Sequence, residues 1–154
     1  MKTFKQLVAE QEELVNEIMP WDLEGKLAKQ EKPLLVDIRE ADEFTAMHIQ
    51  NSINVPRGLL EAACDYNYSE TVPELVQARD REVVVICRSG NRSVLAAYTM
   101  QQMGYQHVMS LKTGLKGWND FEQTLISEKQ EKIDIDAAEQ FLNPEIKAQQ
   151  LSTK

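Results

Sequence analysis

The stretch VVVICRSGNRSVLAAYTM, residues 83–100, decides the fold of this chain. Its first four residues are apolar and β-branched, which is typical of a strand buried on both faces. Residues 93–100 predict a helix. Between the two lies the loop CRSGNR at 87–92, which contains one glycine. A strand that leads through a short loop into a helix is the repeating unit of parallel sheets, and we therefore expect an α/β fold.

The same alternation of strands and helices continues on the N-terminal and C-terminal sides of this stretch. The helix after the loop is expected to end near Gly104. Short apolar runs predict three further strands, and mixed patterns predict three further helices: strands at 34–38, 53–56 and 107–111, and helices at 40–46, 59–64 and 72–78. Strands that alternate with helices imply a parallel sheet covered by helices.

The two ends of the chain differ from this central part. Residues 3–18 place apolar side chains among charged ones at helical spacing, and a second helix is predicted from Pro20 to about Gln30. From Ser127 onward the chain is charged, and Asp134 or Asp136 could begin another helix.

These differences predict three parts: an N-terminal helical extension, a central domain and a C-terminal helical tail, at 1–16, 17–124 and 125–154. The apolar stripes at 4–18 and 136–146 must be buried somewhere. We expect them to pack on the domain or to pair across a homodimer.

The composition restricts the partners and the compartment. The chain has 154 residues and a net charge of −8, so it can form one packed domain but offers no basic face to nucleic acid or to an anionic membrane. No apolar run approaches the roughly 20 residues of a membrane span, and no secretory signal is visible, so we expect a cytoplasmic protein. The two cysteines and two histidines fit no metal-binding spacing, and no metal or cofactor is expected.

Cys87 is the candidate catalytic residue. A loop between a buried strand and a helix directs backbone N–H groups into one concavity, and the helix dipole adds positive potential there. A cysteine at the first position of the loop would be held as the nucleophilic thiolate. Gly90 permits the turn, while Arg88 and Arg92 add positive charge. We therefore expect an accessible, reactive thiolate, although packing at a strand end is the simpler role of a free cysteine.

Three ordered motifs resemble the signatures of the single-domain rhodanese family, over about residues 17–122. The loop at 87–93 is similar to the active-site loop of that family, and GLKGW at 114–118 is similar to its C-terminal signature. The N-terminal signature is matched by four short segments: VDIRE at 36–40, EF at 43–44, HI at 48–49 and INVP at 53–56. One departure is Met47, at a position where the family usually has glycine.

This resemblance implies a rhodanese-like three-layer fold, with a five-stranded parallel sheet flanked by helices. It also implies an enzyme, a sulfurtransferase that works without a cofactor. In the implied reaction, Cys87 takes the outer sulfur of a small donor such as thiosulfate and carries it as a persulfide. A thiophilic acceptor, such as cyanide or a thiol, then takes the sulfur, and a sulfur-relay protein is a candidate partner.

The predicted substrate-binding loop comprises six residues: Arg88, Ser89, Gly90, Asn91, Arg92 and Ser93. Its two arginines are expected to differ, because Arg92 opens the following helix while Arg88 follows the cysteine directly. We expect Arg92 to support the loop and Arg88 to face the donor. Asp37 and Arg39 stand at the carboxyl end of a strand, and we expect them to form a supporting ion pair under the loop.

The second cysteine, Cys64, lies on a predicted apolar helix and is expected to fill the core. A resolving partner for Cys87 is the alternative role. Structural or solvated roles are expected for the remaining candidates, which are His48, Arg57, His107 and Trp118.

Two other functions remain open at this point. Cysteine-based phosphatases and arsenate reductases of related fold have five residues between the cysteine and the arginine, whereas four separate Cys87 from Arg92. The shorter loop favours a sulfur atom over a tetrahedral phosphate. The second alternative is a sulfur carrier or docking module that performs no turnover of its own.

Overall fold

The computed structural model describes residues 1–153 and contains a five-stranded parallel sheet. The strands are β1 (Asn16–Ile18), β2 (Leu34–Asp37), β3 (Ile53–Asn54), β4 (Glu82–Ile86) and β5 (His107–Leu111). Their order is β1-β5-β4-β2-β3, and each neighbouring pair is parallel. The central strand, β4, lies between β5 and β2, so its carboxyl end is surrounded by other strand ends.

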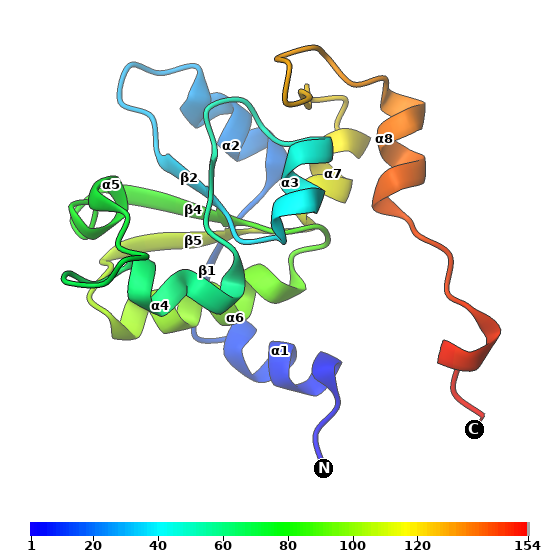
Figure 1. The fold of residues 1–154 in the computed structure, drawn as a ribbon, viewed down its shortest axis with the longest axis horizontal. Helices are drawn as coiled ribbons and strands as arrows, with labels where there is room; N and C mark the ends of the chain where they lie inside the picture. The colour runs from blue at the N-terminus through cyan, green and yellow to red at the C-terminus, as the bar shows by residue number, and fades with distance from the viewer. Residues whose placement is uncertain (154) are drawn as a thin grey trace.

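Helices cover both faces of the sheet and make a three-layer structure (Figure 1). The helices are α1 (Phe4–Glu12), α2 (Pro20–Leu27), α3 (Ala41–Ala46), α4 (Leu60–Ala63), α5 (Pro73–Val76), α6 (Asn91–Gln102), α7 (Gly114–Asp120) and α8 (Ile135–Leu142). Helices α4, α5 and α6 pack on one face, while α2 and α7 pack on the other, with α8 outside them. The fold therefore agrees with the predicted α/β class.

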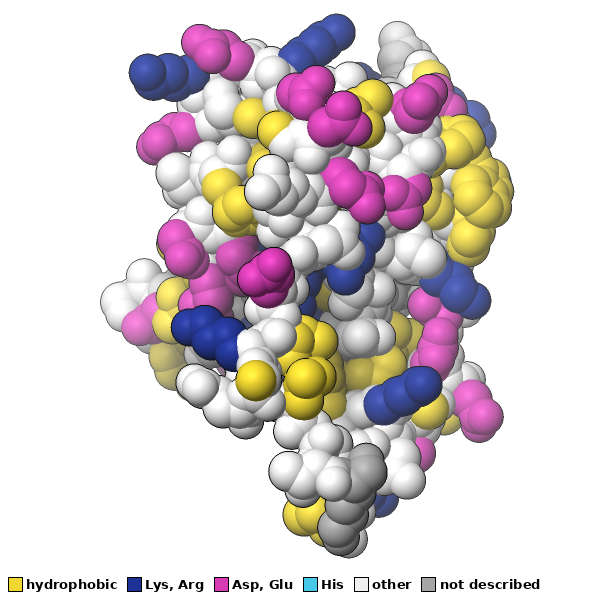
Figure 2. Space-filling view, turned by 90° about the vertical axis from the view of Figure 1, so that its right-hand side faces the viewer, with side chains coloured by type: hydrophobic (Ala, Val, Ile, Leu, Met, Phe, Trp, Pro, Cys, Tyr) yellow, Lys and Arg dark blue, Asp and Glu magenta, His cyan; other side chains and the backbone are white. Residues whose placement is uncertain are grey.

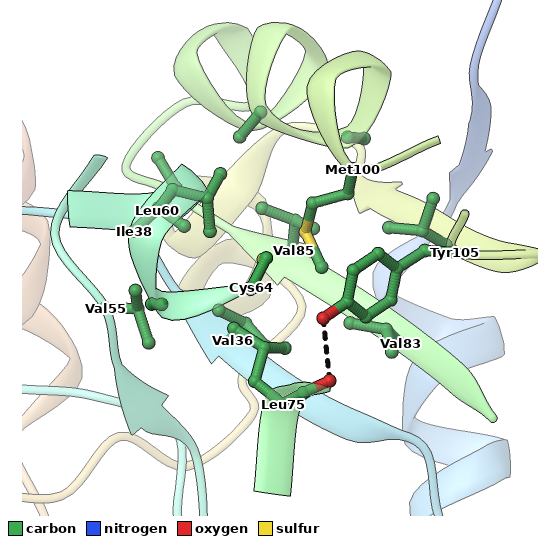
Figure 3. Packing of buried hydrophobic residues seen from close by; sticks show 14 of the residues in the cluster. Val36, Ile38, Val55, Leu60, Cys64, Leu75, Val83, Val85, Met100 and Tyr105 are labelled. Carbon is green, nitrogen blue, oxygen red and sulfur yellow. Dashed lines mark hydrogen bonds between the residues drawn. The ribbon is translucent and has the colours of Figure 1, made fainter. Parts of the chain in front are cut away.

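The alternation of side chains along β4 divides the core into two clusters. Val83, Val85 and Cys87 belong to the cluster under α6, and Val84 and Ile86 belong to the cluster under α7. Figure 3 shows the first cluster, in which the Tyr105 hydroxyl donates a hydrogen bond to the carbonyl oxygen of Leu75 at 2.7 Å. Because both faces of β4 are covered, the strand holds the start of the Cys87 loop rigidly.

The predicted strands are confirmed, with ends that differ by one or two residues, but the sequence interpretation missed one strand. A single helix over 3–18 was expected, and this is wrong beyond Glu12, because Asn16–Ile18 forms β1. β1 pairs with β5, whose backbone groups would otherwise form an open edge of the sheet. A three-residue strand is too short to show an alternating pattern, and its apolar residues fit helical spacing equally well. The helix predicted to reach Gln30 ends at Leu27.

Both terminal helices contact the domain. α1 packs against α6 and buries Val8, while α8 packs against α7 and buries Ala138 and Leu142. Asp134, one of the two candidate caps, begins α8 by accepting a hydrogen bond from the backbone N–H of Ala137 at 3.1 Å. After α8 the chain continues as a largely extended segment (Figure 1). Pairing across a dimer stays a prediction.

Two negative observations apply to residues 1–153. None of their helices is long and apolar enough to cross a membrane. Over the same range, no group of three or more His, Cys, Asp or Glu side chains is arranged to hold a metal ion.

Candidate active site

Cys87 directly follows β4 and precedes the loop that leads into α6. The side chain is fully buried, with 0% relative exposure, so the expected accessible thiolate is not seen. The reason is the shape of the loop, which folds back over the sulfur instead of leaving it at the bottom of an open concavity. The sulfur is therefore closed to solvent in this structure.

The loop surrounds the sulfur with hydrogen-bonding groups. The backbone N–H groups of Gly90 and Ser93 donate to Cys87 Sγ at 3.1 and 3.3 Å. The Ser93 hydroxyl oxygen also lies 3.3 Å from Sγ. Gly90 has a φ of 90°, which L side chains rarely adopt, so a glycine at this position allows the turn that aims these amides at the sulfur. The N-terminus of α6 adds its positive dipole end at the same place.

The start of α7 holds the other side of the loop. The backbone N–H groups of Leu115 and Lys116 donate to the carbonyl oxygens of Cys87 and Arg88, both at 3.0 Å. Gly114 makes this approach possible, because a Cβ there would lie 2.6 Å from the backbone of Cys87 and Arg88. The motif at 114–118, which carried only a resemblance in the sequence, therefore has a structural purpose. It fixes the peptide planes of the cysteine loop from outside.

Arg92 is held by an acidic side chain from α3. Its two terminal nitrogens donate to the carboxylate oxygens of Glu43 at 3.0 and 3.1 Å, a bidentate pair. Burial opposes ionisation of Glu43, but the hydrogen bonds from Arg92 and from the Glu40 backbone N–H, together with the charges of Arg92 and Arg39, outweigh it and lower the pKa of the Glu43 carboxyl. Hydrogen bonding to Glu43 likewise raises the pKa of Arg92. The guanidinium thus ties the start of α6 to α3, as expected for an arginine that supports the loop.

Arg88 has a different environment. Its side chain is partly exposed, and its Nε is buried without a hydrogen-bond partner among residues 1–153. A buried guanidinium nitrogen without an acceptor is costly, and an anion bound at the loop would satisfy it. The geometry is compatible with the predicted division between the two arginines, whose roles in a reaction stay predictions.

Asp37 and Arg39 form a fully buried ion pair at the end of β2, with 2.9 Å between Arg39 Nη2 and Asp37 Oδ2. Arg39 Nη2 also donates to the carbonyl oxygen of Met47 at 2.6 Å. The intervening residue, Ile38, donates its N–H to the carbonyl oxygen of Ile86 at 2.9 Å. The ion pair therefore braces the strand end directly before Cys87, and its contribution to function stays a prediction.

Cys64 is equally buried but lies in the apolar core with Leu60, Leu75 and Tyr105 (Figure 3). Burial is the largest influence on this thiol and raises its pKa. Cys64 and Cys87 are both free thiols. The surroundings of Cys64 match the expected core role and favour the neutral thiol.

The remaining candidates have structural contacts. His48 stacks on Phe44, with ring centroids 4.0 Å apart, and its Nδ1 lies 2.9 Å from the Phe44 carbonyl oxygen. Arg57 pairs with Glu61 at 2.8 Å on the surface. Met47, which replaces the usual glycine, has a φ of −166°, an extended conformation open to any residue. The departure from the family pattern therefore causes no backbone strain.

The sequence analysis missed two residues that contact the loop. Glu43 was quoted only as part of a motif, and its pairing with Arg92 depends on a contact between residues 49 positions apart. Ser110, on β5, is fully buried and lies 2.7 Å from the Ser93 hydroxyl oxygen. A serine within the apolar strand HVMSL was the available signal for Ser110.

The site lies on an acidic molecule. Figure 2 looks at the side toward which β4 runs in Figure 1, and acidic side chains are spread over much of this face, with Lys or Arg atoms visible near its centre. The net charge of the chain is −8. Positive potential is therefore a local property, supplied by the loop arginines, the amides and the α6 terminus.

A parallel α/β domain with a cysteine enclosed by loop amides at the end of its central strand defines a class of cysteine-dependent α/β proteins. Within that class, a family model described as the rhodanese-like domain matches residues 21–121. The chain belongs to the rhodanese-like family. The predicted family and the predicted fold class are both confirmed.

Individual relatives agree with this assignment. The chain is 37% identical over 105 residues to a sulfurtransferase of Allochromatium vinosum, covering 68% of this chain and 89% of that protein. It is 32% identical over 103 residues to the adenylyltransferase and sulfurtransferase UBA4 of Candida albicans, covering 67% of this chain. This second match spans only 23% of UBA4, so the chain corresponds to one part of that protein.

A solved structure from Rhodopseudomonas palustris, RPA3614, has the same fold, with a TM-score of 0.70 and 28% identity. The match covers 80% of this chain and 93% of that one. That protein is described as having unknown function and as a possible tyrosine phosphatase. The chemistry at the cysteine therefore has to be decided from the loop itself.

Proposed function

We propose that this protein is a sulfurtransferase that carries sulfane sulfur on Cys87. The observation that carries the proposal is the enclosure of Sγ by the N–H groups of Gly90 and Ser93, at 3.1 and 3.3 Å. Such donors stabilise an anionic sulfur without taking part in covalent chemistry. The relatives named as sulfurtransferases support the same reaction class.

The reaction has two half-reactions. The Cys87 thiolate attacks the outer sulfur of a donor such as thiosulfate, the sulfur–sulfur bond of the donor breaks, and sulfite leaves with the electron pair. The product is a persulfide anion on Cys87. A thiophilic acceptor, cyanide or a thiolate, then attacks the outer sulfur, and the Cys87 thiolate leaves. Cyanide becomes thiocyanate, and no oxidant, metal or cofactor is consumed.

Arg88 is the residue that we assign to donor binding. Its buried Nε lacks a partner in the described chain, and an anionic donor at the loop would supply one. A charge-assisted hydrogen bond of this kind contributes about 1.5–3 kcal/mol. Arg92, already paired with Glu43, supports the loop. Ser89 and Asn91 complete the walls of the binding loop, and Asp37 with Arg39 braces the strand end beneath it.

Access to the sulfur is part of the proposal, because Cys87 is fully buried. Movement of the half-buried Arg88 and Ser89 side chains would expose Sγ. During this movement, the hydrogen bonds from α7 to the carbonyl oxygens of Cys87 and Arg88 would hold the backbone of the loop in place. The sulfur would thus be exposed only while the loop is displaced, which limits the access of other thiols to the persulfide.

Phosphate-ester hydrolysis is the alternative raised by the likeness to RPA3614. The present loop has four residues between Cys87 and Arg92, and it closes on the sulfur itself. A tetrahedral phosphate needs room for three oxygens within the ring of amides. We therefore rank sulfur transfer above hydrolysis.

A relay role remains compatible with the same chemistry. In UBA4 the matching region is one part of a larger protein named adenylyltransferase and sulfurtransferase. A domain that receives sulfur from one protein and passes it to another would need the same Cys87 persulfide. We place the reaction in the cytoplasm, where reducing conditions keep both thiols free.

The decisive experiment is intact mass spectrometry of the protein after incubation with thiosulfate. We expect a gain of one sulfur atom, located by peptide mapping to Cys87 and removed by cyanide. The same preparation should release thiocyanate in steady state and should not hydrolyse an aryl phosphate. Absence of the sulfur adduct, together with turnover of the phosphate ester, would reverse the ranking of the two reactions.

Loop length provides a second test of the same ranking. Insertion of one glycine between Asn91 and Arg92 lengthens the loop to five intervening residues. We expect weaker sulfur transfer, because the amides move away from Sγ. Insertion of one glycine between Tyr66 and Asn67, in an exposed loop, is the control for the effect of an added residue on stability. Faster sulfur transfer in the longer loop would contradict the size argument.

A further inference from the structure

Ser110 is a polar side chain on an otherwise apolar face of β5. It is fully buried, and it lies on the α6 side of the sheet, as does Val108 two residues before it. In the register of the sheet it is aligned with Val85 of β4. A buried hydroxyl lowers stability unless it is hydrogen-bonded, so its partner indicates why it is tolerated there.

The partner is the Ser93 hydroxyl, which itself contacts the reactive sulfur. Ser110 Oγ lies 2.7 Å from Ser93 Oγ, and Ser93 Oγ lies 3.3 Å from Cys87 Sγ. All three residues have 0% relative exposure. A continuous chain of polar atoms therefore runs from β5 through the first turn of α6 to the end of β4.

The number of protons available decides which group donates in each of these two hydrogen bonds. A serine hydroxyl has one proton to donate and two lone pairs that accept. When Cys87 is a thiol, its S–H can donate to Ser93 Oγ. When Cys87 is a thiolate, the sulfur accepts only, and Ser93 must use its single proton on Sγ. The bond between the two serines can then exist only if Ser110 donates to Ser93.

We propose that Ser110 is a positioning residue that aims the Ser93 hydroxyl proton at Cys87 Sγ in the thiolate state. The proposal rests on the proposed function, because it assigns a role within the sulfur-transfer site. By donating to Ser93, Ser110 removes the competing orientation in which Ser93 donates to Ser110. It does not touch the reacting atoms itself.

Both half-reactions pass through the Cys87 thiolate, which is the state that the Ser110–Ser93 hydrogen bonds stabilise. Cys87 is a thiolate when it attacks the donor, and it leaves as a thiolate when the acceptor takes the outer sulfur. In the intermediate persulfide the negative charge lies on the outer sulfur, so Sγ no longer needs the third donor. Ser110 is therefore expected to accelerate both half-reactions rather than to stabilise the intermediate.

Charged groups around the loop are the same with or without the Ser110 hydroxyl. They come from each neighbouring element: Arg88 on the loop, Arg92 on α6, Glu43 on α3, Asp37 and Arg39 at the end of β2, and Lys116 on α7. Arg92 and Glu43 are paired with each other, and so are Asp37 and Arg39. A change in reactivity in a Ser110 variant therefore reports the hydroxyl chain.

The test is the rate at which iodoacetamide alkylates Cys87, measured by peptide mapping across a range of pH. This readout uses no sulfur donor, so it is independent of sulfur transfer. We expect Ser110→Ala to react about three- to tenfold more slowly near neutral pH, since one hydrogen bond in the chain is lost. The deficit should be smaller at alkaline pH than near neutral pH. Ser110→Thr, which retains a hydroxyl, should keep the wild-type profile.

A double-mutant cycle shows whether Ser110 acts through Ser93. Ser93→Ala alone should slow alkylation at least as much as Ser110→Ala, and adding Ser110→Ala to it should cause no further loss. Val108→Ala, on the same face of β5, is the matched control for loosened packing. It should speed alkylation of the buried sulfur by increasing loop opening, which is the opposite sign.

Three results would overturn the proposal: wild-type alkylation in Ser110→Ala, faster alkylation as in the Val108 control, or an equal loss in the presence and absence of Ser93. Melting temperatures identify any variant that fails to fold. If Ser110→Ala does not fold, Ser110→Thr still tests the hydroxyl. A folded Ser110→Thr variant that loses the neutral-pH alkylation rate would contradict the proposal. If Ser110→Ala slows alkylation only when Ser93 is present, and no persulfide forms with thiosulfate, the proposed function is wrong while the positioning role stands.

Discussion

The two cysteines of this chain are equally buried in the same apolar cluster under α6, but different groups reach their sulfur atoms. Cys87 and Cys64 both have 0% relative exposure. Cys87 lies at a strand end, where two backbone N–H groups and a hydroxyl oxygen surround its sulfur. Cys64 ends α4 within an apolar cluster, where burial raises the pKa of its thiol. Burial alone therefore does not distinguish the proposed sulfur carrier from the proposed core residue.

The difference lies in the hydrogen-bond donors that reach the sulfur. At Cys87, donors come from the loop and from the N-terminus of α6, and they favour an anionic sulfur. At Cys64, Arg79 donates to the backbone carbonyl at 2.6 Å, and although its charge favours the thiolate, burial is the largest influence and raises the pKa of the thiol. The geometry of the backbone that follows Cys87 is therefore the basis on which we propose it as the reactive cysteine.

Replacement of the sulfur at Cys87 should have the largest effect. Cys87→Ser keeps the size of the side chain but cannot form a persulfide, so sulfur transfer should fall by about a thousandfold or more. The melting temperature should change by only a few degrees, because the hydroxyl still accepts from the loop amides. Steady-state release of thiocyanate provides the measurement. Substantial remaining turnover would assign the carrier role to Cys64 and break the contrast between the two sites.

A methyl group at Gly114 should damage the Cys87 site without replacing either cysteine. Gly114 has a φ of 60°, and a Cβ there would lie 2.6 Å from the backbone of Cys87 and Arg88. We expect Gly114→Ala to lower sulfur transfer about ten- to a hundredfold and to lower stability by about 1–3 kcal/mol. Gly58→Ala is the control, since nothing lies within 4 Å of its Cβ position. Equal behaviour of the two variants would show that α7 does not shape the loop.

Removal of Arg88 should weaken donor binding. We expect Arg88→Ala to lower kcat/KM for thiosulfate about ten- to a hundredfold, mainly through KM, because one charge-assisted contact is lost. Arg57→Ala, which removes a surface arginine paired with Glu61, is the control for net charge. Steady-state kinetics with thiosulfate as the varied substrate measure both effects. A change confined to kcat would assign Arg88 to the chemical step.

Acid should loosen the support of the Cys87 loop through Glu43. The pKa of this carboxyl is lowered in the folded protein from its usual value of 4.5, so its pairing with Arg92 is fully present above about pH 4.5 and is lost as the pH falls through the lowered value. Glu43→Gln should therefore cost about 1 kcal/mol of stability near neutral pH and less in acid.

Denaturant unfolding of the wild type and of Glu43→Gln at several pH values checks this prediction. We also expect a severalfold loss of sulfur transfer near neutral pH in Glu43→Gln, because Arg92 is no longer held by a charged partner. Glu61→Gln, which alters an exposed pair with Arg57, should change the stability by no more than about 0.5 kcal/mol and the rate of sulfur transfer by no more than about twofold. A stability difference that grew in acid would have the wrong sign for this account.

The smallest effect on activity is expected at Cys64. Cys64→Ala should retain sulfur transfer within about twofold, because the side chain packs in the core and its raised pKa keeps the thiol neutral. Its stability should fall by about 1 kcal/mol, the ordinary cost of a small cavity. Mass spectrometry after thiosulfate treatment should find the added sulfur unchanged. A large loss of turnover with an intact fold would indicate a redox partnership between the two cysteines.

Prediction from the sequence succeeded where the determining contacts are local. The strand and helix on either side of the Cys87 loop were predicted correctly, because the pattern of each is contained within a few consecutive residues. Asp37 and Arg39 were also expected to pair, since only one residue separates them at a strand end. β1 was missed because its three residues become a strand only by pairing with β5.

The sequence by itself determined the class of the fold, and it placed the candidate cysteine and its loop between a strand and a helix, because these depend on patterns within short segments. Tertiary structure alone decided which donors reach Sγ, and it brought Glu43, Ser110 and the start of α7 to the loop from distant positions. It also closed the loop over Cys87, which the sequence had led us to expect in the open. The physical reason is that these hydrogen bonds and this burial depend on contacts between segments distant in the sequence, which a pattern within one short segment does not predict.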